Sequence, residues 1–297
     1  MTLDQLRIFV AVATRLHVTQ AAHELNLTQS AASAAIAALE TQYRTLLFHR
    51  IGRRIELTEA GRLFLGEARA VLQRAGEAEL MLSELAGLRR GKLAVAASQT
   101  ISNYWLPPVL WRYRQHYPNI ELTLSIGNTE HVARAILGGS AELGFIEGAV
   151  EDTALRQTDI AVDELTLVVA PGHRWISTPP AGSADLAAGP WVLREAGSGT
   201  RQVFEADLGG LGLKPADLRV ALELPSNEAV CSAVEAGAGA TVVSHSVVAA
   251  ALQAGRLCRV PLELPPRRYA LVRHGERYLS RAAQALQSLI LRGEPAG

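Results

Sequence analysis

Residues 19–40 carry the pattern of two short alanine-rich helices separated by a polar turn. Apolar residues recur at helical spacing up to Leu25, the pattern stops at Asn26, and Ile36 and Leu39 continue it on a second segment. This arrangement is typical of a helix-turn-helix. A generic helical hairpin inside an all-α core is the alternative that the segment leaves open.

The second helix of this pair is expected to begin after Thr28, whose hydroxyl can cap its N-terminus. Small polar side chains, Gln29, Ser30 and Ser33, then lie on its first turns, where a recognition helix meets base edges. An amphipathic segment upstream, residues 3–13, supplies a further helix that completes a three-helix core.

Residues 46–61 predict a wing after the helix pair. Arg50, Arg53 and Arg54 surround Gly52, and glycine allows the positive φ of a tight turn. Arginines on such a hairpin can reach phosphates or a narrow minor groove. A solvated surface loop is the alternative reading of the three arginines.

Residues 1 to about 90 resemble the DNA-binding domain of a LysR-type transcriptional regulator. The matching residues are Leu3 to Phe9, Ala21, Ala22, Leu25, Thr28 to Ala31, Ser33, Ile36, Leu39, Glu40, Leu47, Phe48, Arg50, Leu57, Thr58, Ala60 and Gly61. The resemblance implies that Gln29, Ser30 and Ser33 face bases or phosphates and that Arg53 is the wing contact.

Two departures from the family pattern limit what the resemblance implies about base preference. The segment Tyr43-Arg44-Thr45 replaces the usual Leu-Gly turn after the recognition helix. Ala34 stands where several members carry an arginine that contacts DNA. A base preference therefore cannot be copied from a relative.

No proline interrupts residues 58–88, so this segment is predicted to form one long helix. Its apolar residues repeat at alternating steps of four and three, the spacing of a coiled-coil seam: Phe64, Ala68, Val71, Ala75, Ala78, Leu82 and Leu85. We expect the seam to form a homodimer, and the resemblance implies the same linker-helix dimer. An amphipathic helix lying on its own core is the alternative. The predicted divisions are a winged helix-turn-helix at 1–58, a linker helix at 59–91 and an effector domain at 92–297.

The composition fits a chain with more than one core. It has 297 residues, 48% of them hydrophobic, and 29 basic residues balance 29 acidic ones. No membrane span or secretion signal is evident, so we expect a cytoplasmic protein. Cys231 and Cys258 lack CxxC spacing and are expected to be buried structural thiols. His173 and His245 are expected in loops, and neither a metal site nor a cofactor is predicted.

After Gly91 short apolar strands alternate with amphipathic helices, which predicts parallel α/β units in two lobes. The resemblance extends to this half and implies a periplasmic-binding-protein-like fold. One lobe is placed at 92–162 with 267–297, and the other at 163–266. The fold class expected for the whole chain is α+β multidomain, with the ligand in the cleft between the lobes.

The candidate effector residues lie mainly at four strand-to-helix junctions, where unpaired N–H groups and the helix dipole favour anions. They are Ser98, Gln99, Thr100, Asn128, Thr129, Ser198, Gly199, Thr200, Arg201, Ser226 and Asn227. Ordinary helix capping is the alternative at each junction. In the GSGTR segment, glycines let amides approach an oxyanion and Arg201 can add a charge-assisted hydrogen bond. Glu147 could accept from a ligand amine or hydroxyl, or be a solvated loop carboxylate.

The sequence therefore predicts a DNA-binding transcriptional regulator that is switched by a small, anionic effector. Its expected partners are double-stranded promoter DNA, its own copies as a homodimer or homotetramer, the effector, and RNA polymerase. Residues 194–201 also resemble a segment of regulators of sulfur assimilation. The alternative is a solute-binding module or a phosphate-cradling enzyme built on the α/β half, although residues 92–297 lack Walker, GxSxG and Cys-His patterns, so no catalytic residue is predicted.

Overall fold

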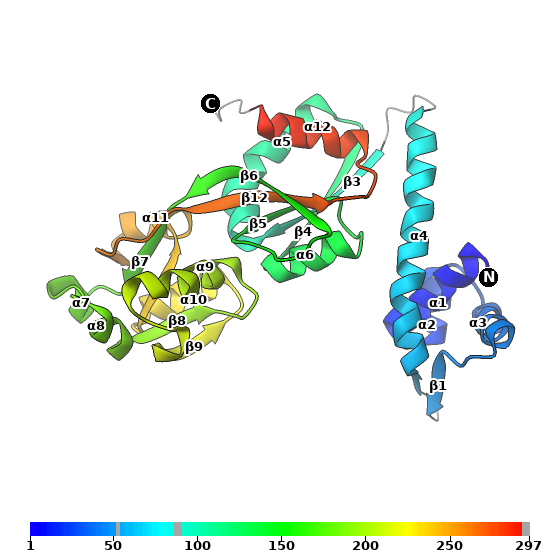
Figure 1. Cartoon of the computed structure of the whole chain (residues 1–297), viewed down its shortest axis with the longest axis horizontal. Coiled ribbons are helices and arrows are strands. Elements are labelled where there is room, and N and C mark those ends of the chain that lie inside the picture. The colour runs from blue at the N-terminus through cyan, green and yellow to red at the C-terminus, as the bar shows by residue number, and fades with distance from the viewer. Residues whose placement is uncertain (52–53, 86–90, 293–297) are drawn as a thin grey trace. The chain divides into compact units, whose positions relative to one another are not determined.

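The computed structural model describes residues 1–51, 54–85 and 91–292 and divides the chain into two compact units, 1–88 and 89–297 (Figure 1). Each unit has its own hydrophobic core. The predicted fold class is confirmed: a helix-turn-helix unit is followed by an α/β domain of two sheets.

The N-terminal unit contains three short helices, a two-stranded hairpin and a long helix. They are α1 (Leu3–Arg15), α2 (Val18–Glu24), α3 (Gln29–Tyr43), β1 (Phe48–Ile51), β2 (Arg54–Leu57) and α4 (Glu59–Leu85). Side-chain oxygens of Thr2 and Thr28 accept from backbone N–H groups three residues on and so cap α1 and α3. The predicted helix-turn-helix is therefore α2 and α3, and the strands of the predicted wing pair antiparallel.

Side-chain hydrogen bonds explain the roles of Glu40 and Thr58, to which the spacing of apolar residues alone assigns none. Glu40 accepts hydrogen bonds from the backbone N–H groups of Leu47 and Phe48, at 2.7 and 3.2 Å, which fixes the chain as it enters β1. The hydroxyl of Thr58 accepts from the N–H of Gly61 at the start of α4. A Cβ on Gly61 would overlap the carbonyl oxygen of Leu47, so only glycine fits this position.

Helix α4 belongs in part to the core of its own unit. The ring of Phe64 lies 5.0 Å from that of Phe9, and Ala68 is fully buried. The sequence prediction assigned Phe64 to a dimer seam. In the single chain Phe64 is partly buried and packs against the core of its own unit, because α4 packs against α1 over this turn. Further along, Val71 and Leu82 are exposed in the single chain. The side chain of Leu85 lies outside the described residues.

The second unit is built on two five-stranded sheets, one in each lobe. The lobe I sheet has the order β4 (Ile120–Gly127), β3 (Gly91–Ser98), β5 (Leu143–Glu147), β12 (Arg267–His274) and β6 (Leu155–Asp163). The lobe II sheet has the order β11 (Cys258–Val260), β7 (Leu165–Val169), β10 (Ala240–Ser244), β8 (Pro190–Arg194) and β9 (Arg219–Leu224). The chain therefore crosses between the lobes twice, after β6 and after β11.

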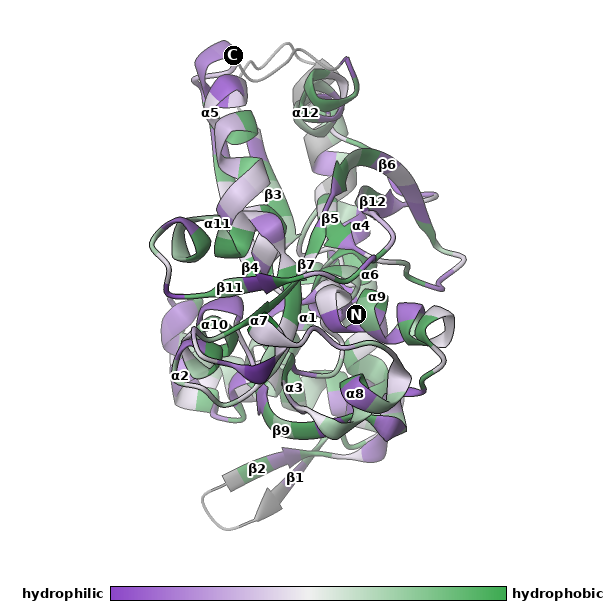
Figure 2. Cartoon of the chain, turned by 90° about the vertical axis from the view of Figure 1, so that its left-hand side faces the viewer, coloured by the Kyte–Doolittle hydropathy of each residue, from purple (hydrophilic) through white to green (hydrophobic). Residues whose placement is uncertain are grey.

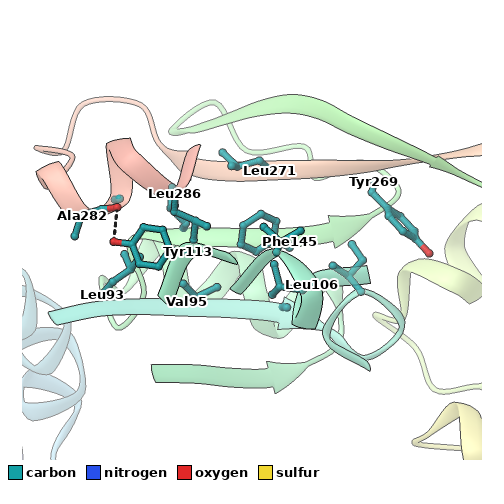
Figure 3. Close-up of a cluster of buried hydrophobic side chains, with 14 residues drawn as sticks. Leu93, Val95, Leu106, Tyr113, Phe145, Tyr269, Leu271, Ala282 and Leu286 are labelled. Carbon is teal, nitrogen blue, oxygen red and sulfur yellow. Dashed lines mark hydrogen bonds between the residues drawn. The ribbon is translucent and has the colours of Figure 1, made fainter. Parts of the chain in front are cut away.

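Helices cover both faces of each sheet. The helices of lobe I are a π-helix (Ile101–Trp105), α5 (Leu106–His116), α6 (Thr129–Leu137) and α12 (Arg281–Leu291). Those of lobe II are α7 (Arg174–Ser177), α8 (Ser183–Ala188), α9 (Gly199–Asp207), α10 (Asn227–Glu235) and α11 (His245–Gln253), together with two 3-10 turns (Leu208–Leu211 and Pro215–Asp217). Because both faces are covered, every residue of β5 and β7 is buried, and apart from Glu147 at the end of β5 both strands consist mainly of apolar residues, as the colouring of Figure 2 reflects. In the core of lobe I, shown in Figure 3, the hydroxyl of Tyr113 donates to the carbonyl of Ala282 at 3.0 Å.

Several sequence predictions for this half need correction. The sheets are mixed rather than parallel, since β12 pairs antiparallel with β5 and β6, and β10 pairs antiparallel with β7. Strands β6 and β11 were not predicted: β6 is largely exposed at a sheet edge and has no alternating apolar pattern, and β11 is only three residues long. His245 is the first residue of α11 rather than a loop residue.

Candidate DNA-binding and effector-binding sites

The predicted base-contacting residues lie together on the first turns of α3. Gln29 and Ser30 are exposed and Ser33 is half-buried. The side-chain amide of Gln29 donates to the hydroxyl of Ser33 at 3.0 Å, and the hydroxyls of Thr28 and Ser30 are 3.0 Å apart. These contacts hold the polar side chains in place on the helix surface. Of the wing arginines, Arg53 and the side chains of Arg50 and Arg54 lie outside the described residues.

The unusual turn after α3 has a defined geometry. Arg44 adopts a left-handed backbone conformation (φ 53°) and ends the helix, where glycine is the common residue. The N–H groups of Arg44 and Thr45 bond the carbonyls of Thr41 and Glu40 at 3.3 and 3.0 Å. The turn therefore forms without the glycine usual in the family, at the expense of backbone strain at Arg44.

In the second unit, the predicted effector junctions of the two lobes meet and bond one another. The side-chain oxygen of Gln99 accepts from the backbone N–H of Asn227 at 2.8 Å, and its amide donates to Glu228 at 2.7 Å. The hydroxyl of Thr100 accepts from the side-chain amide of Asn227 at 3.1 Å. Asn227 is fully buried. The start of α10 in lobe II therefore packs against the end of β3 in lobe I. Ser226 caps α10, and the hydroxyl of Ser98 is buried without a hydrogen-bond partner.

A second set of contacts joins the starts of α6 and α9. The hydroxyl of Thr129 donates to the carbonyl of Glu147 at 2.9 Å. A Cβ on Gly199 would overlap that same carbonyl oxygen and the Thr129 hydroxyl, and a Cβ on Gly197 would lie 2.7 Å from a carboxylate oxygen of Glu130. In the structure the two glycines therefore allow close approach of the lobes, whereas the sequence analysis assigned them to approach of an oxyanion.

A buried arginine links the two sets of contacts. Arg194 donates to both carboxylate oxygens of Glu195 at 2.8 and 3.0 Å, and to the side-chain oxygen of Asn227 at 2.7 Å. Glu195 also accepts from the side-chain amide of Asn128 at 3.1 Å. Burial acts to raise the pKa of Glu195, but the hydrogen bonds and charge of Arg194 outweigh it, so the pKa lies below its usual value.

Arg201 does not offer the free guanidinium that the sequence suggested. Its Nε donates to Glu205 at 2.7 Å, and its Nη1 bonds Glu223 and the backbone carbonyl of Arg194. All of these partners lie in lobe II. The spacing of Arg201 and Glu205 by four residues on a helix is the signal that could have predicted this pairing.

Sequence reasoning missed a buried ionic cluster on the two crossing strands. Arg267, at the start of β12, donates from Nε to Asp163 at 2.6 Å and from Nη1 to the hydroxyl of Thr200 at 2.9 Å. The other oxygen of Asp163 accepts from the hydroxyl of Ser244 at 2.7 Å. Glu147 completes the cluster, with Oε1 3.8 Å from Nη2 of Arg267. Arg267 therefore contacts both lobes at the point where the chain crosses.

A cavity of about 540 Å³ opens between the lobes beside these contacts. Thr129, Ser198 and Arg201 lie in its wall, together with the acidic residues Glu130, Glu151 and Glu205, so the cavity is more acidic than basic. The buried cations with hydrogen-bonding neighbours, Arg194 and Arg267, are not in that wall. The positive charge that suits an anion is therefore outside the cavity wall, although the wall includes Thr129 and Ser198 at the starts of α6 and α9.

Other groups offer little chemistry in the described part of the chain. Across the described residues, no three His, Cys, Asp or Glu side chains gather as metal ligands. Burial, with smaller contributions from Glu228 and Glu235, raises the pKa of Cys231 to about 12, so its thiol is not a reactive thiolate at neutral pH. Both cysteines are partly rather than fully buried. The described helices include none that is long and apolar enough to cross a membrane.

A helix-turn-helix unit attached to a two-lobed ligand-binding fold defines a ligand-responsive DNA-binding protein. Comparison with known proteins agrees: residues 3–62 match the model of the bacterial regulatory helix-turn-helix protein, lysR family, and residues 86–294 match the LysR substrate binding domain. The chain belongs to the LysR family of transcriptional regulators.

Named relatives cover nearly the whole chain. The uncharacterized HTH-type transcriptional regulator YeiE of Escherichia coli strain K12 is 39% identical over 284 residues, which is 95% of this chain and 94% of the relative. A probable RuBisCO transcriptional regulator of Cyanophora paradoxa is 34% identical, covering 98% and 91%. The structure of full-length CbnR complexed with its target DNA has the same fold, with a TM-score of 0.70, 24% identity and coverage of 98% and 99%. The suggested likeness to sulfur-assimilation regulators is not confirmed.

Proposed function

We propose that this regulator senses a small anion, which binds at the junction of the two lobes and changes how far they close. The observation that carries the proposal is the meeting of helix starts from both lobes at Asn227, next to the buried Arg194. Helix starts supply unpaired N–H groups and a positive dipole end, which favour negative charge. Solved effector domains of the same fold, QuiR and CcmR, were obtained in complex with shikimate and with 2-PG.

The site proposed for the anion differs in part from the one that the sequence suggested. Ser98, Thr100, Thr129, Thr200 and Asn227 stay in it, because they are buried where the lobes meet. Arg201 is no longer included in the site, because two carboxylates of its own lobe bind its guanidinium. The interlobe hydrogen bonds of Gln99 and Asn227 are the ones that an incoming anion displaces. A ligand shifts the lobes only by its preference for one arrangement over the other.

The substitution Asn227→Asp tests this site, because it adds a negative charge with almost no change in shape. We expect the full-length protein to be stabilised by at least one of phosphate, sulfate, acetate and glycolate, by about 2.7 kcal/mol at 100 times the dissociation constant. Asn227→Asp should weaken that binding at least tenfold while the gel shift of upstream DNA is retained. Isothermal titration and thermal unfolding measure both quantities.

Asn119→Asp, an exposed change in lobe I, serves as the matched control and should bind the anions as the unmodified protein does. Equal anion binding by Asn227→Asp and the unmodified protein would remove Asn227 from the site. Failure of all four anions to stabilise the protein would contradict the anion proposal itself.

We also propose that the exposed apolar residues of α4 form the contact between two copies of the chain. Val71, Met81 and Leu82 are 41%, 42% and 67% exposed, and Val71, Ala75, Ala78 and Leu82 keep the spacing of a coiled-coil seam. Leu82→Glu should lower the oligomeric state in sedimentation experiments, because two buried carboxylates would face each other. Glu79→Gln on the same helix is the control. An unchanged sedimentation coefficient for Leu82→Glu would contradict the seam.

Three further parts of the proposal concern the cellular setting. The protein acts in the cytoplasm, where promoter DNA is, and it meets RNA polymerase at the promoter. It regulates transcription without catalysing a reaction, so no turnover of a phosphorylated or acylated substrate is expected. Salt-dependent binding to its own upstream DNA would support this assignment, whereas measurable turnover would favour the enzyme alternative.

A further inference from the structure

Two buried charged atoms have no hydrogen-bond partner at the point where the lobes meet. They are Nη2 of Arg267 and Oε1 of Glu147. Their side chains are only 1% and 3% exposed, and the two atoms are 3.8 Å apart, too far for a direct hydrogen bond. Buried polar atoms in folded proteins are nearly always bonded, so this pair needs a third group.

The surroundings of the two atoms connect them to the proposed effector site. The remaining guanidinium nitrogens of Arg267 are used by Asp163 and by the hydroxyl of Thr200, in the first turn of α9. The backbone carbonyl of Glu147 bonds Thr129 and lies against Gly199. A molecule that binds at the starts of α6 and α9 therefore has the unpaired atoms of Glu147 and Arg267 beside it.

The two atoms require opposite kinds of hydrogen-bond partner. Nη2 of Arg267 can only donate, and a carboxylate oxygen of Glu147 can only accept. One hydroxyl oxygen placed about 2.8 Å from each atom satisfies both, because it accepts from the guanidinium and donates to the carboxylate. An oxygen without a proton could not bond the Glu147 carboxylate, because both oxygens would present lone pairs and neither could donate. An ammonium group would face the positive charge of Arg267.

We propose that the effector carries a hydroxyl group and that this hydroxyl bridges Glu147 and Arg267. The ligand class is an anion with its own O–H, such as a small hydroxycarboxylate or singly protonated phosphate, and fully ionised sulfate is rejected. The inference rests on the anion site proposed above and narrows its chemistry. A site built to bond a hydroxyl discriminates strongly against analogues that lack it.

Matched pairs of anions test the bridge in the full-length protein at neutral pH. Isothermal titration compares glycolate with acetate, lactate with propionate, and phosphate with sulfate. We expect the member of each pair that carries an O–H to bind at least tenfold more tightly. Glu147→Gln should remove this preference, because its amide can donate to an unprotonated oxygen as well as accept. Glu263→Gln, an exposed change in lobe II outside the cavity wall, should leave the preference intact.

Each outcome decides the matter. Equal binding of both members of every pair to the unmodified protein would overturn the bridge while leaving the anion site in place, and this comparison does not depend on the folding of any variant. A preference that survives in a folded Glu147→Gln protein would place the hydroxyl elsewhere and also overturn the bridge. Binding of none of the six anions would overturn the anion site and the bridge together.

Discussion

A glycine packed against a backbone carbonyl, with a threonine hydroxyl beside it, is found in both units of the molecule. In the N-terminal unit, Gly61 lies against the carbonyl of Leu47, and the hydroxyl of Thr58 donates to the neighbouring carbonyl of Leu46 at 2.8 Å. In the second unit, Gly199 lies against the carbonyl of Glu147, to which Thr129 donates at 2.9 Å. Neither glycine has room for a Cβ.

The two contacts differ in what they hold together. The first joins α4 to the segment that enters β1, and both belong to one hydrophobic core. The second joins α9 of lobe II to β5 of lobe I, whose cores are separate. A similar close approach of glycine to a carbonyl therefore stabilises a fold in one unit and sets the distance between two lobes in the other. Substitution should affect stability in the first and lobe closure in the second.

The largest expected effect is that of Gly61→Ala. The added methyl group overlaps the carbonyl of Leu47, and overpacking of this kind lowers the free energy of unfolding by about 2 kcal/mol. Urea unfolding of the full-length protein should show the loss in the N-terminal unit, and the gel shift should weaken. Gly66→Ala is the control, since its Cβ meets nothing and the change should stabilise α4 slightly. Equal stability of the Gly61 and Gly66 variants would contradict the contact.

Gly199→Ala should have a smaller effect on stability, below about 1 kcal/mol, and a large effect on closure. The methyl group cannot fit against Glu147, so the lobes are held apart. Hydrogen exchange should then speed up at the N–H of Asn227 and of Glu130, both of which bond across the lobes. Gly209→Ala, which has open space around it, is the control. Unchanged exchange at both amides would show that the contact does not set lobe spacing.

The difference between the units also explains what the sequence could predict. Local signals sufficed for the helix-turn-helix, because capping by Thr28 and the apolar spacing of α3 act within a few residues. The same signals located the strand-to-helix junctions of the second unit. They could not show that Asn227 bonds Gln99 across 128 residues, so the junctions were assigned to a ligand when they in part bond each other.

The ionic cluster was missed for the same reason. Arg267 follows a proline pair at the start of an apolar strand, and nothing near it in sequence indicates that Asp163 is its partner, 104 residues away. The pairing depends on the register of β12 against β6, which opposes Arg267 to Asp163. The available signal was a charged residue at the buried end of a strand. Its partner can be identified only once the fold is known.

The smallest expected effect comes from relieving the backbone strain at Arg44, which takes part in neither of the two glycine contacts. Arg44 holds a left-handed conformation that L-residues with a Cβ disfavour, so Arg44→Gly should raise the free energy of unfolding by about 1 kcal/mol. Arg44→Ala keeps the Cβ and should give no gain. Urea midpoints measure both variants, and hydrogen exchange at Asn227 and Glu130 should not change, because the turn lies in the other unit. A gain shared by Arg44→Ala would assign the effect to the loss of the arginine charge rather than to the backbone.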